Sequence, residues 1–227
     1  MISATLLVQQ WCNDQALVGD KILGLCAPPG SGKSWLCNQL SDVPSLSIDD
    51  LYWPQPLLQQ HQRGLPGSHD LHLLTKILND FRQHGEAVAP YFDKRLAAGA
   101  GDRCGERLLK GDLLLLEGWC VGARGTPALK PYQAIWHQLD CLLLLIPPSY
   151  GRVLRWRLQA EAKQRRRGGA ALTATQVVEM VQSFYAALPP QLCFQPLYQQ
   201  PLLPTWLLKL DYQRRPVGAL QLVNQLG

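Results

Sequence analysis

The chain has 227 residues, of which 47% are hydrophobic, which suits one α/β domain with insertions. Its seven cysteines form no C-x-x-C pair, which argues against a zinc ribbon or a thioredoxin-type site, and their odd number fits a reducing cytosol. We expect a cytoplasmic protein without a membrane partner. No basic leader precedes an apolar core, and the longest apolar runs, 113–116 and 141–146, are too short to cross a bilayer.

The positive charge is unevenly distributed along the chain. The net charge is +5, and residues 152–167 hold six arginines and one lysine against a single acid, Glu161. Such a stretch is a solvated helix face, a nucleic-acid contact or a lid that closes on phosphates. Only Trp156 would stack on bases there, so we expect no nucleic-acid partner.

Strand and helix patterns alternate through the sequence. After a leading helix over 3–18, buried strands are expected at 21–26, 44–50, 112–119, 140–148 and 205–211. Helices are expected at 33–40, 70–84, 149–166, 173–187 and 216–226. Segment 52–69 is expected to be irregular, 87–94 a short strand or extended loop, and 99–107 a loop. The pattern predicts a single three-layer α/β/α domain with a mainly parallel five-stranded sheet, in which ligands bind beyond the carboxyl ends of the strands.

The segment LCAPPGSGKSW, residues 25–35, has the arrangement of a phosphate-binding loop between a strand and a helix. Its glycines let backbone N–H groups approach phosphate oxygens, Lys33 would reach the β- and γ-phosphates, and Ser34 would hold Mg²⁺. Ala27 stands where the loop pattern has glycine, and the alternative is a turn with a chance lysine. Strand, GKS triplet and helix together favour an ATP-binding loop of the P-loop NTPase type. The expected nucleotide-binding residues are Pro29, Gly30, Ser31, Gly32, Lys33, Ser34 and Trp35.

Three acidic residues follow predicted strands. Phosphoryl transfer to an alcohol needs a group that orients the hydroxyl and takes its proton, and Asp49 is placed for that role. Asp50 either helps to bind the acceptor or only caps the turn. Glu117 ends an apolar strand, where a carboxylate is costly without a partner, so we expect it to manage Mg²⁺ together with Ser34 and Asp49. The alternative for Glu117 is a side chain that reaches solvent.

Six segments resemble the D-glycerate 3-kinase family in sequence and in order: APPGSGKS, SIDDLY, GLPGSHD, FDKRLAAGAGDR, LEGWCVG and RWRLQAE. The resemblance covers about residues 20–215. It implies a P-loop kinase related to uridine kinase, pantothenate kinase and phosphoribulokinase. It also implies transfer of the ATP γ-phosphate to the C3 hydroxyl of D-glycerate, the photorespiratory-type reaction that gives 3-phosphoglycerate. Ser68 stands where threonine is commoner in the family, which is a mild change. Phe92 and Arg95 also depart from the usual residues, which affects the acceptor pocket more than the reaction.

The acceptor residues are expected between 52 and 110. A hydroxy acid calls for a cation at its carboxylate, ideally a bidentate arginine, and Arg103 follows a glycine-rich loop that would hold it. Asp102 would orient that arginine or bind an acceptor hydroxyl, and His69, Asp93 and Lys94 are further substrate-binding candidates. The alternatives are a surface ion pair for Asp93 and Lys94 and a helix cap for His69.

The basic stretch fits a helical lid over residues 149–190. In the related kinases a helix pair closes on the phosphates, and positive charge there would stabilise the transferring group. Arg152, Arg155 and Arg157 are the expected lid residues.

Other functions remain as alternatives. A sister kinase acting on pantothenate, uridine or a sugar phosphate would use the same loop, Asp49 and Glu117. A regulatory GTPase is disfavoured because the sequence has no N-K-x-D motif. A nucleotide-binding switch without catalysis is disfavoured by the intact Lys33 and Ser34.

Overall fold

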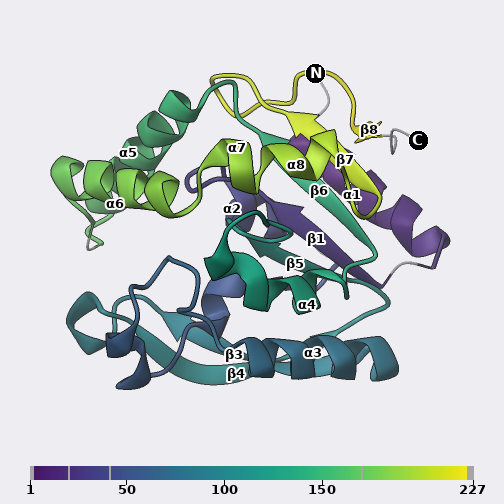
Figure 1. The fold of residues 1–227 in the computed structure, drawn as a ribbon, viewed down its shortest axis with the longest axis horizontal. Coiled ribbons are helices and arrows are strands. Elements are labelled where there is room, and N and C mark those ends of the chain that lie inside the picture. Colours follow the sequence, from purple (N-terminus) through teal and green to yellow (C-terminus); the bar gives the residue numbers. More distant parts are fainter. Residues whose placement is uncertain (1–2, 20, 41, 170, 224–227) are drawn as a thin grey trace.

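The computed structural model describes residues 3–19, 21–40, 42–169 and 171–223. Its centre is a six-stranded sheet in the order β2-β5-β1-β6-β7-β8 (Figure 1). The strands are β1 (Ile22–Cys26), β2 (Ser45–Ser47), β5 (Leu114–Gly118), β6 (Cys141–Ile146), β7 (Thr205–Lys209) and β8 (Gln221–Val223). The first five run parallel, and β8 pairs antiparallel with β7. The α/β fold with a mainly parallel sheet is therefore confirmed, but the sheet has six strands and not the five expected.

The closing helix expected over 216–226 is wrong where the structure describes it, because 221–223 forms the edge strand β8. Residues 224–226 lie outside the described residues. A short apolar run such as ALQLV fits the helical period and the strand period equally well. The open edge of β7 decides between them by pairing Trp206 with Leu222.

Helices cover both faces of the sheet, as the apolar strands require. The helices are α1 (Ala4–Leu17), α2 (Lys33–Cys37), α3 (Leu71–His84), α4 (Gln133–Trp136), α5 (Tyr150–Arg166), α6 (Ala174–Ala187), α7 (Pro190–Cys193) and α8 (Gln195–Gln199). On one face, α1, α2 and α5 pack their apolar side chains with Leu23 and Leu25 of β1. On the other face, α3, α4, α6, α7 and α8 pack with Ile22 and Cys26 of the same strand. The phosphate loop joins β1, which lies between these layers, to α2.

A smaller lobe extends from the second of these faces. It contains α3 and a two-stranded antiparallel sheet of β3 (Glu86–Asp93) and β4 (Asp102–Lys110), seen at the bottom of Figure 1. The loop expected over 99–107 is wrong from Asp102 onward, because pairing with β3 makes that segment a strand. Its glycine-rich sequence has no alternating apolar pattern, so only the partner strand reveals it. Asp70 caps α3 as expected by accepting a hydrogen bond from the Leu73 N–H (3.0 Å).

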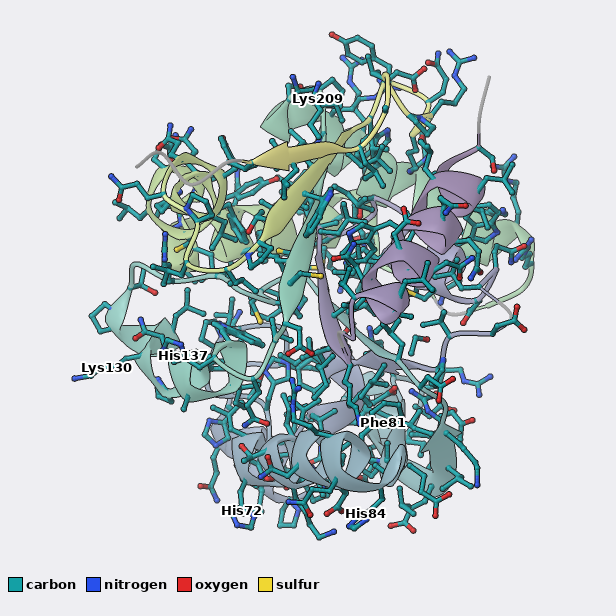
Figure 2. All side chains as sticks on the ribbon, turned by 90° about the vertical axis from the view of Figure 1, so that its right-hand side faces the viewer. His72, Phe81, His84, Lys130, His137 and Lys209 are labelled. Carbon is teal, nitrogen blue, oxygen red and sulfur yellow. The ribbon has the colours of Figure 1, made fainter. Side chains whose placement is uncertain are left out.

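The described residues also contain the short 3-10 helices η1 (Ile48–Leu51), η2 (Leu57–Gln60), η3 (Ala97–Gly99) and η4 (Pro127–Tyr132). The helix α3 presents its polar side chains, including His72 and His84, on its outer side (Figure 2). Within the described residues, no helix combines the length and the apolar composition that a bilayer crossing requires.

Candidate functional site

The phosphate loop leaves β1 at Cys26 and enters α2 at Lys33. Gly30 and Gly32 have φ values of +79° and +96°, a region that favours glycine. A Cβ atom on Gly30 would lie 3.0 Å from the backbone nitrogen of Arg157, so the loop is fitted closely against α5. Ala27 is buried and is not among the residues with positive φ, so this position needs no glycine here.

Ser34 and Glu117 meet at the carboxyl ends of β1 and β5. The Ser34 hydroxyl donates a hydrogen bond to Glu117 Oε1 (2.9 Å), and Glu117 is only 3% exposed. In the sheet, Leu25 of β1 pairs with Glu117 of β5. Glu117 therefore lies at the end of β1 from which the phosphate loop leads to Ser34 in α2. Hydroxyl and carboxylate oxygens are ligands that Mg²⁺ accepts beside nucleotide phosphates. The residues therefore fit a nucleotide-bound Mg²⁺.

The rest of the loop also fits a triphosphate. The Ser31 hydroxyl is buried and has no partner among the described residues. The Lys33 ammonium likewise makes no hydrogen bond or ion pair within the described part of the chain. Trp35 is 63% exposed on the first turn of α2, beside this loop. Unpaired donors next to glycines that allow close backbone approach are suited to an anionic ligand.

Asp49 lies in η1, directly after β2, and is the centre of a polar cluster. Its carboxylate accepts a hydrogen bond from the Tyr52 hydroxyl (2.9 Å) and forms an ion pair with Lys94 (2.6 Å). Burial raises the pKa of Asp49, but the Lys94 ammonium and the Tyr52 hydroxyl outweigh burial and hold the pKa well below its usual value. The carboxylate is therefore ionised at neutral pH.

His69 lies against this cluster and is 2% exposed. Its ring stacks on Tyr52 with centroids 4.6 Å apart, and Nδ1 is 2.7 Å from the Tyr132 hydroxyl. That hydroxyl also accepts a hydrogen bond from the Gly67 N–H (2.9 Å), so its own proton is directed to Nδ1. The His69 Nε2 atom then carries the other proton and has no partner among the described residues. Burial lowers the pKa of His69 to about 4, while Asp49 opposes that effect, so the ring is neutral at pH 7.

The structure engages other predicted acceptor residues in contacts within the small lobe. Arg103 donates to the Tyr52 carbonyl (3.0 Å) and forms an ion pair with Asp70 (3.1 Å). Asp102 accepts hydrogen bonds from the backbone N–H groups of Gln55 (3.0 Å) and Arg103 (2.8 Å). These contacts join β4 to the segment that carries Tyr52 and to the start of α3.

Asp50 and Asp93 are each paired with an arginine of the small lobe. Asp50 forms an ion pair with Arg107 (2.9 Å) and accepts the Phe92 N–H (3.2 Å), which ties η1 to β3. Asp93 holds the exposed side chain of Arg95 (2.6 Å). The structure thus brings Lys94, not its neighbour Asp93, to Asp49.

The segment expected to act as a lid contains α5 and α6, which project together at one side of the sheet (Figure 1). Arg152 donates to the Tyr212 carbonyl (2.7 Å), and Arg157 pairs with the buried Glu161. Arg155 is exposed and has no partner within the described residues. In this arrangement Arg155 is the expected lid residue whose guanidinium is not already engaged.

Sequence reasoning missed Arg214, which follows β7. Its guanidinium donates to the Gly30 carbonyl (2.9 Å) and the Trp156 carbonyl (3.1 Å), and lies 5.1 Å from the centre of the Trp156 ring. It therefore fastens the phosphate loop to α5 and to the end of the sheet. Tyr132 was missed as well. Neither residue belongs to a local motif, so no sequence signal marks them.

Kinases are among the known proteins that this chain resembles. No family model matches the chain. The protein named uncharacterized kinase mug58, from Schizosaccharomyces pombe, is 31% identical, and the alignment covers 72% of this chain and 78% of that protein. Chloroplastic D-glycerate 3-kinase from Arabidopsis thaliana is 28% identical over 78% of this chain. The matched region spans 51% of the plant enzyme, so this chain corresponds to about half of it.

Two solved structures share the fold over nearly the whole chain. D-glycerate 3-kinase from Cryptococcus neoformans superposes with a TM-score of 0.84 at 20% identity, covering 98% of this chain and 100% of that one. The YGR205w protein superposes with a TM-score of 0.81 at 21% identity, covering 98% and 99%. At this level of identity the structures support the fold alone.

Proposed function

Because the chain belongs to the family of D-glycerate 3-kinase-like P-loop kinases, we propose that it transfers the γ-phosphate of ATP to the C3 hydroxyl of D-glycerate. The product would be 3-phosphoglycerate. Kinase relatives support phosphoryl transfer from ATP, and the name of the plant relative motivates the acceptor. We further propose that 52–110 contributes the acceptor site and that 149–190 acts as the lid.

The observation that carries the proposal is the environment of Asp49. An ionised carboxylate, fixed by Tyr52 and Lys94 near the unpaired Nε2 of His69, is suited to accept a hydrogen bond from an alcohol. With its pKa well below the usual value, Asp49 is a weak base that orients the hydroxyl. Phosphoryl transfer tolerates a weak base, because the transition state is loose and the hydroxyl loses its proton late.

The loop residues would hold the triphosphate. Lys33 would contact the β- and γ-phosphates, and Ser34 with Glu117 would hold Mg²⁺, which supplies charge neutralisation at the transferring group. Asp49 is an additional metal candidate. Arg155, free in the lid, would approach the phosphates when α5 and α6 move toward the loop.

The acceptor carboxylate needs a cation near Asp49. Lys94 is already there, and a carboxylate that approached would share its ammonium. Arg103 would contribute if its bond to Asp70 were exchanged for one to the substrate. His69 Nε2–H would donate to an acceptor oxygen.

An acceptor panel tests the proposal. ADP release from MgATP is measured with D-glycerate, L-glycerate, pantothenate, uridine and ribulose 5-phosphate. We expect strong turnover with D-glycerate and identification of the 3-phosphate by NMR. Turnover of another acceptor with none of D-glycerate would keep the kinase and refute the acceptor.

A further inference from the structure

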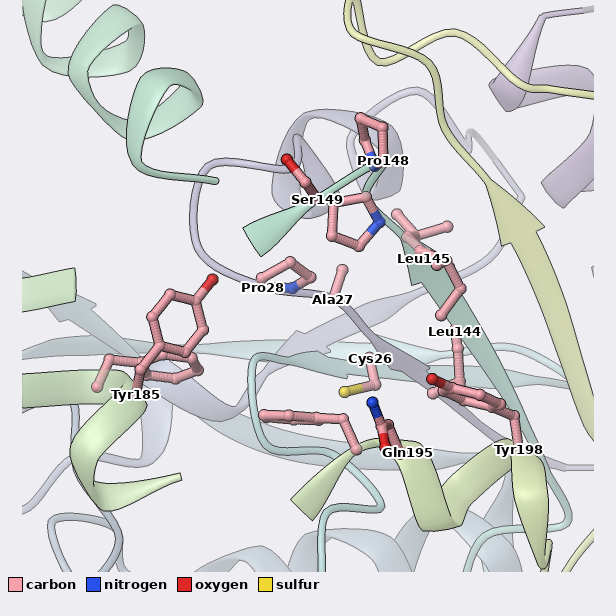
Figure 3. Close-up of a pocket in the computed structure, with 14 residues that line it drawn as sticks. Cys26, Ala27, Pro28, Leu144, Leu145, Pro148, Ser149, Tyr185, Gln195 and Tyr198 are labelled. Atoms are coloured by element: carbon pink, nitrogen blue, oxygen red, sulfur yellow. The ribbon is translucent and has the colours of Figure 1, made fainter. Parts of the chain in front are cut away.

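A cavity of about 390 Å³ lies directly beside the phosphate loop (Figure 3). Its wall includes Ala27 and Pro28 of the loop, the end of β6 with the following prolines, and the helices α6 and α8. Figure 3 shows Tyr185 and Tyr198 on opposite sides, with Pro148 and Ser149 at one end and Gln195 at the other. This volume lies within the range of small-molecule sites.

The cavity is uncharged. Among the described residues, fourteen line it, and none is an acid, a lysine, an arginine or a histidine. Burial raises the pKa of its one thiol, Cys26, to about 12, and this effect is larger than the opposing effect of the Lys33 charge. The thiol is therefore neutral. A carboxylate or phosphate buried here would have no cation to pair with. The cavity therefore does not fit the charged end of a three-carbon hydroxy acid.

The cavity lies at the carboxyl ends of β1 and β6, where the two core clusters meet. Cys26, Leu144 and Phe184 of its wall pack in the same core cluster as Ile48, the residue before Asp49, and Trp119. Ala27 and Leu145 of the wall pack in the other cluster, with α2. An occupant of the cavity would therefore lie between the phosphate loop and the core cluster that leads to Asp49.

A row of aromatic rings joins the cavity to the Asp49 cluster. The ring of Phe184 lies 5.3 Å from Trp119, and Trp119 lies 5.9 Å from His69. His69 in turn stacks on Tyr52, which binds Asp49. The wall of the cavity is therefore connected, ring by ring, to the residues that hold Asp49.

We propose that this cavity takes the uncharged, ring-sized part of a phosphoryl acceptor, so that the enzyme phosphorylates neutral alcohols larger than glycerate. This inference rests on the kinase activity proposed above and widens its acceptor class. The reaction is unchanged: the acceptor oxygen forms a bond to the γ-phosphorus, the bond from that phosphorus to the bridging oxygen of ADP breaks, and the hydroxyl proton passes to Asp49 and then to water. The Tyr198 hydroxyl would bind a polar atom of the ring, and Gln195 would only form part of the wall.

The test uses two neutral primary alcohols that carry a flat ring, uridine and the N-benzylamide of D-glycerate, with D-glycerate as the charged reference. Turnover and binding are measured for wild type, for Gln195→Trp, which fills the cavity, and for Gln195→Ala, which enlarges it. The matched control is Leu202→Trp, at a second cavity of about 220 Å³ that does not touch the loop.

We expect wild type to phosphorylate at least one neutral alcohol. Gln195→Trp should lower kcat/KM for that alcohol by about tenfold or more, because overpacking opposes binding. The same variant should leave the KM for ATP and D-glycerate within about twofold, and Gln195→Ala and Leu202→Trp should retain the activity. If both neutral alcohols fail with wild type, or Gln195→Trp uses them equally well, the inference is wrong. A selective rise in the KM for ATP would assign the cavity to the nucleotide and also overturn it. Turnover of D-glycerate is read separately, so its failure alone would refute the acceptor proposed above.

Discussion

The buried His69 should make this protein lose stability in mild acid, well before most carboxylates titrate. The ring is 2% exposed, packed between Tyr52 and Trp119, and bonded through Nδ1 to Tyr132. Protonation would place a cation among these rings with only Asp49 nearby to stabilise it. The unfolded chain would take up the same proton without that cost.

The magnitude follows from linkage. Burial lowers the pKa of His69 from 6.5 to about 4 in the folded state. Between these values the unfolded state binds more protons than the folded state, so unfolding becomes easier as pH falls. The stability that the neutral His69 contributes to the free energy of unfolding is present in full above about pH 6.5. It is lost as the pH falls to about 4, and the free energy of unfolding then drops by about 3 kcal/mol. Against a typical total of about 5–15 kcal/mol, this is a large fraction.

Urea denaturation at several pH values between about 7 and 4 measures this loss. His69→Gln keeps a polar side chain that the Tyr132 hydroxyl can donate to, and it cannot be protonated. We expect this variant to show a flatter stability profile than wild type between about pH 6.5 and 4. His72→Gln is the matched control, because His72 is exposed on the outer side of α3 (Figure 2), and it should keep the wild-type slope.

Two outcomes would contradict this role of His69. If His69→Gln loses stability over the same pH range and by the same amount as wild type, another group carries the effect. If wild type loses nothing above about pH 4, then His69 is protonated without cost and its burial has been overstated.

Three further changes test the site. Lys33→Ala should abolish ADP release while the thermal unfolding temperature stays near wild type, and full activity would contradict the loop assignment. Lys130→Ala, at an exposed position of η4, should leave both unchanged. Asp49→Asn should lower kcat by about 10²–10⁴ with little effect on the KM for ATP, and equal losses in both parameters would point to a structural role. Gly30→Ala should destabilise the fold by about 1–3 kcal/mol in urea, because of its positive φ and its contact with α5, whereas Gly151→Ala in α5, with open space around it, should not.

Local sequence determined most of the secondary structure. The buried apolar strands, the cap at Asp70 and the helices α5 and α6 depend on patterns that span a few residues, and most lie where the patterns predict them. The strand expected over 44–50 is wrong after Ser47, because the chain turns there into η1 (Ile48–Leu51). The same holds for the glycine-rich turn before α2. The parallel arrangement of five strands follows from their apolar runs and the helices between them.

Pairing between distant segments was decided only by the tertiary structure. Strand β4 has little apolar alternation, and it forms because β3 supplies its hydrogen-bond partners. Strand β8 has an ambiguous pattern, and it forms because β7 supplies its partners. The side-chain contacts of the candidate site are similarly remote. Lys94 reaches Asp49 across 45 residues of sequence, Tyr132 reaches His69 across 63, and Arg214 reaches Gly30 across 184.

The sequence by itself therefore determined the α/β class, the phosphate loop and the acids that follow the strands, because each is encoded within one segment. It did not determine which cation faces Asp49, which hydroxyl orients His69 or where the uncharged cavity lies. Those features depend on how separate segments pack, and packing is set by the whole set of buried contacts rather than by any short stretch of the chain.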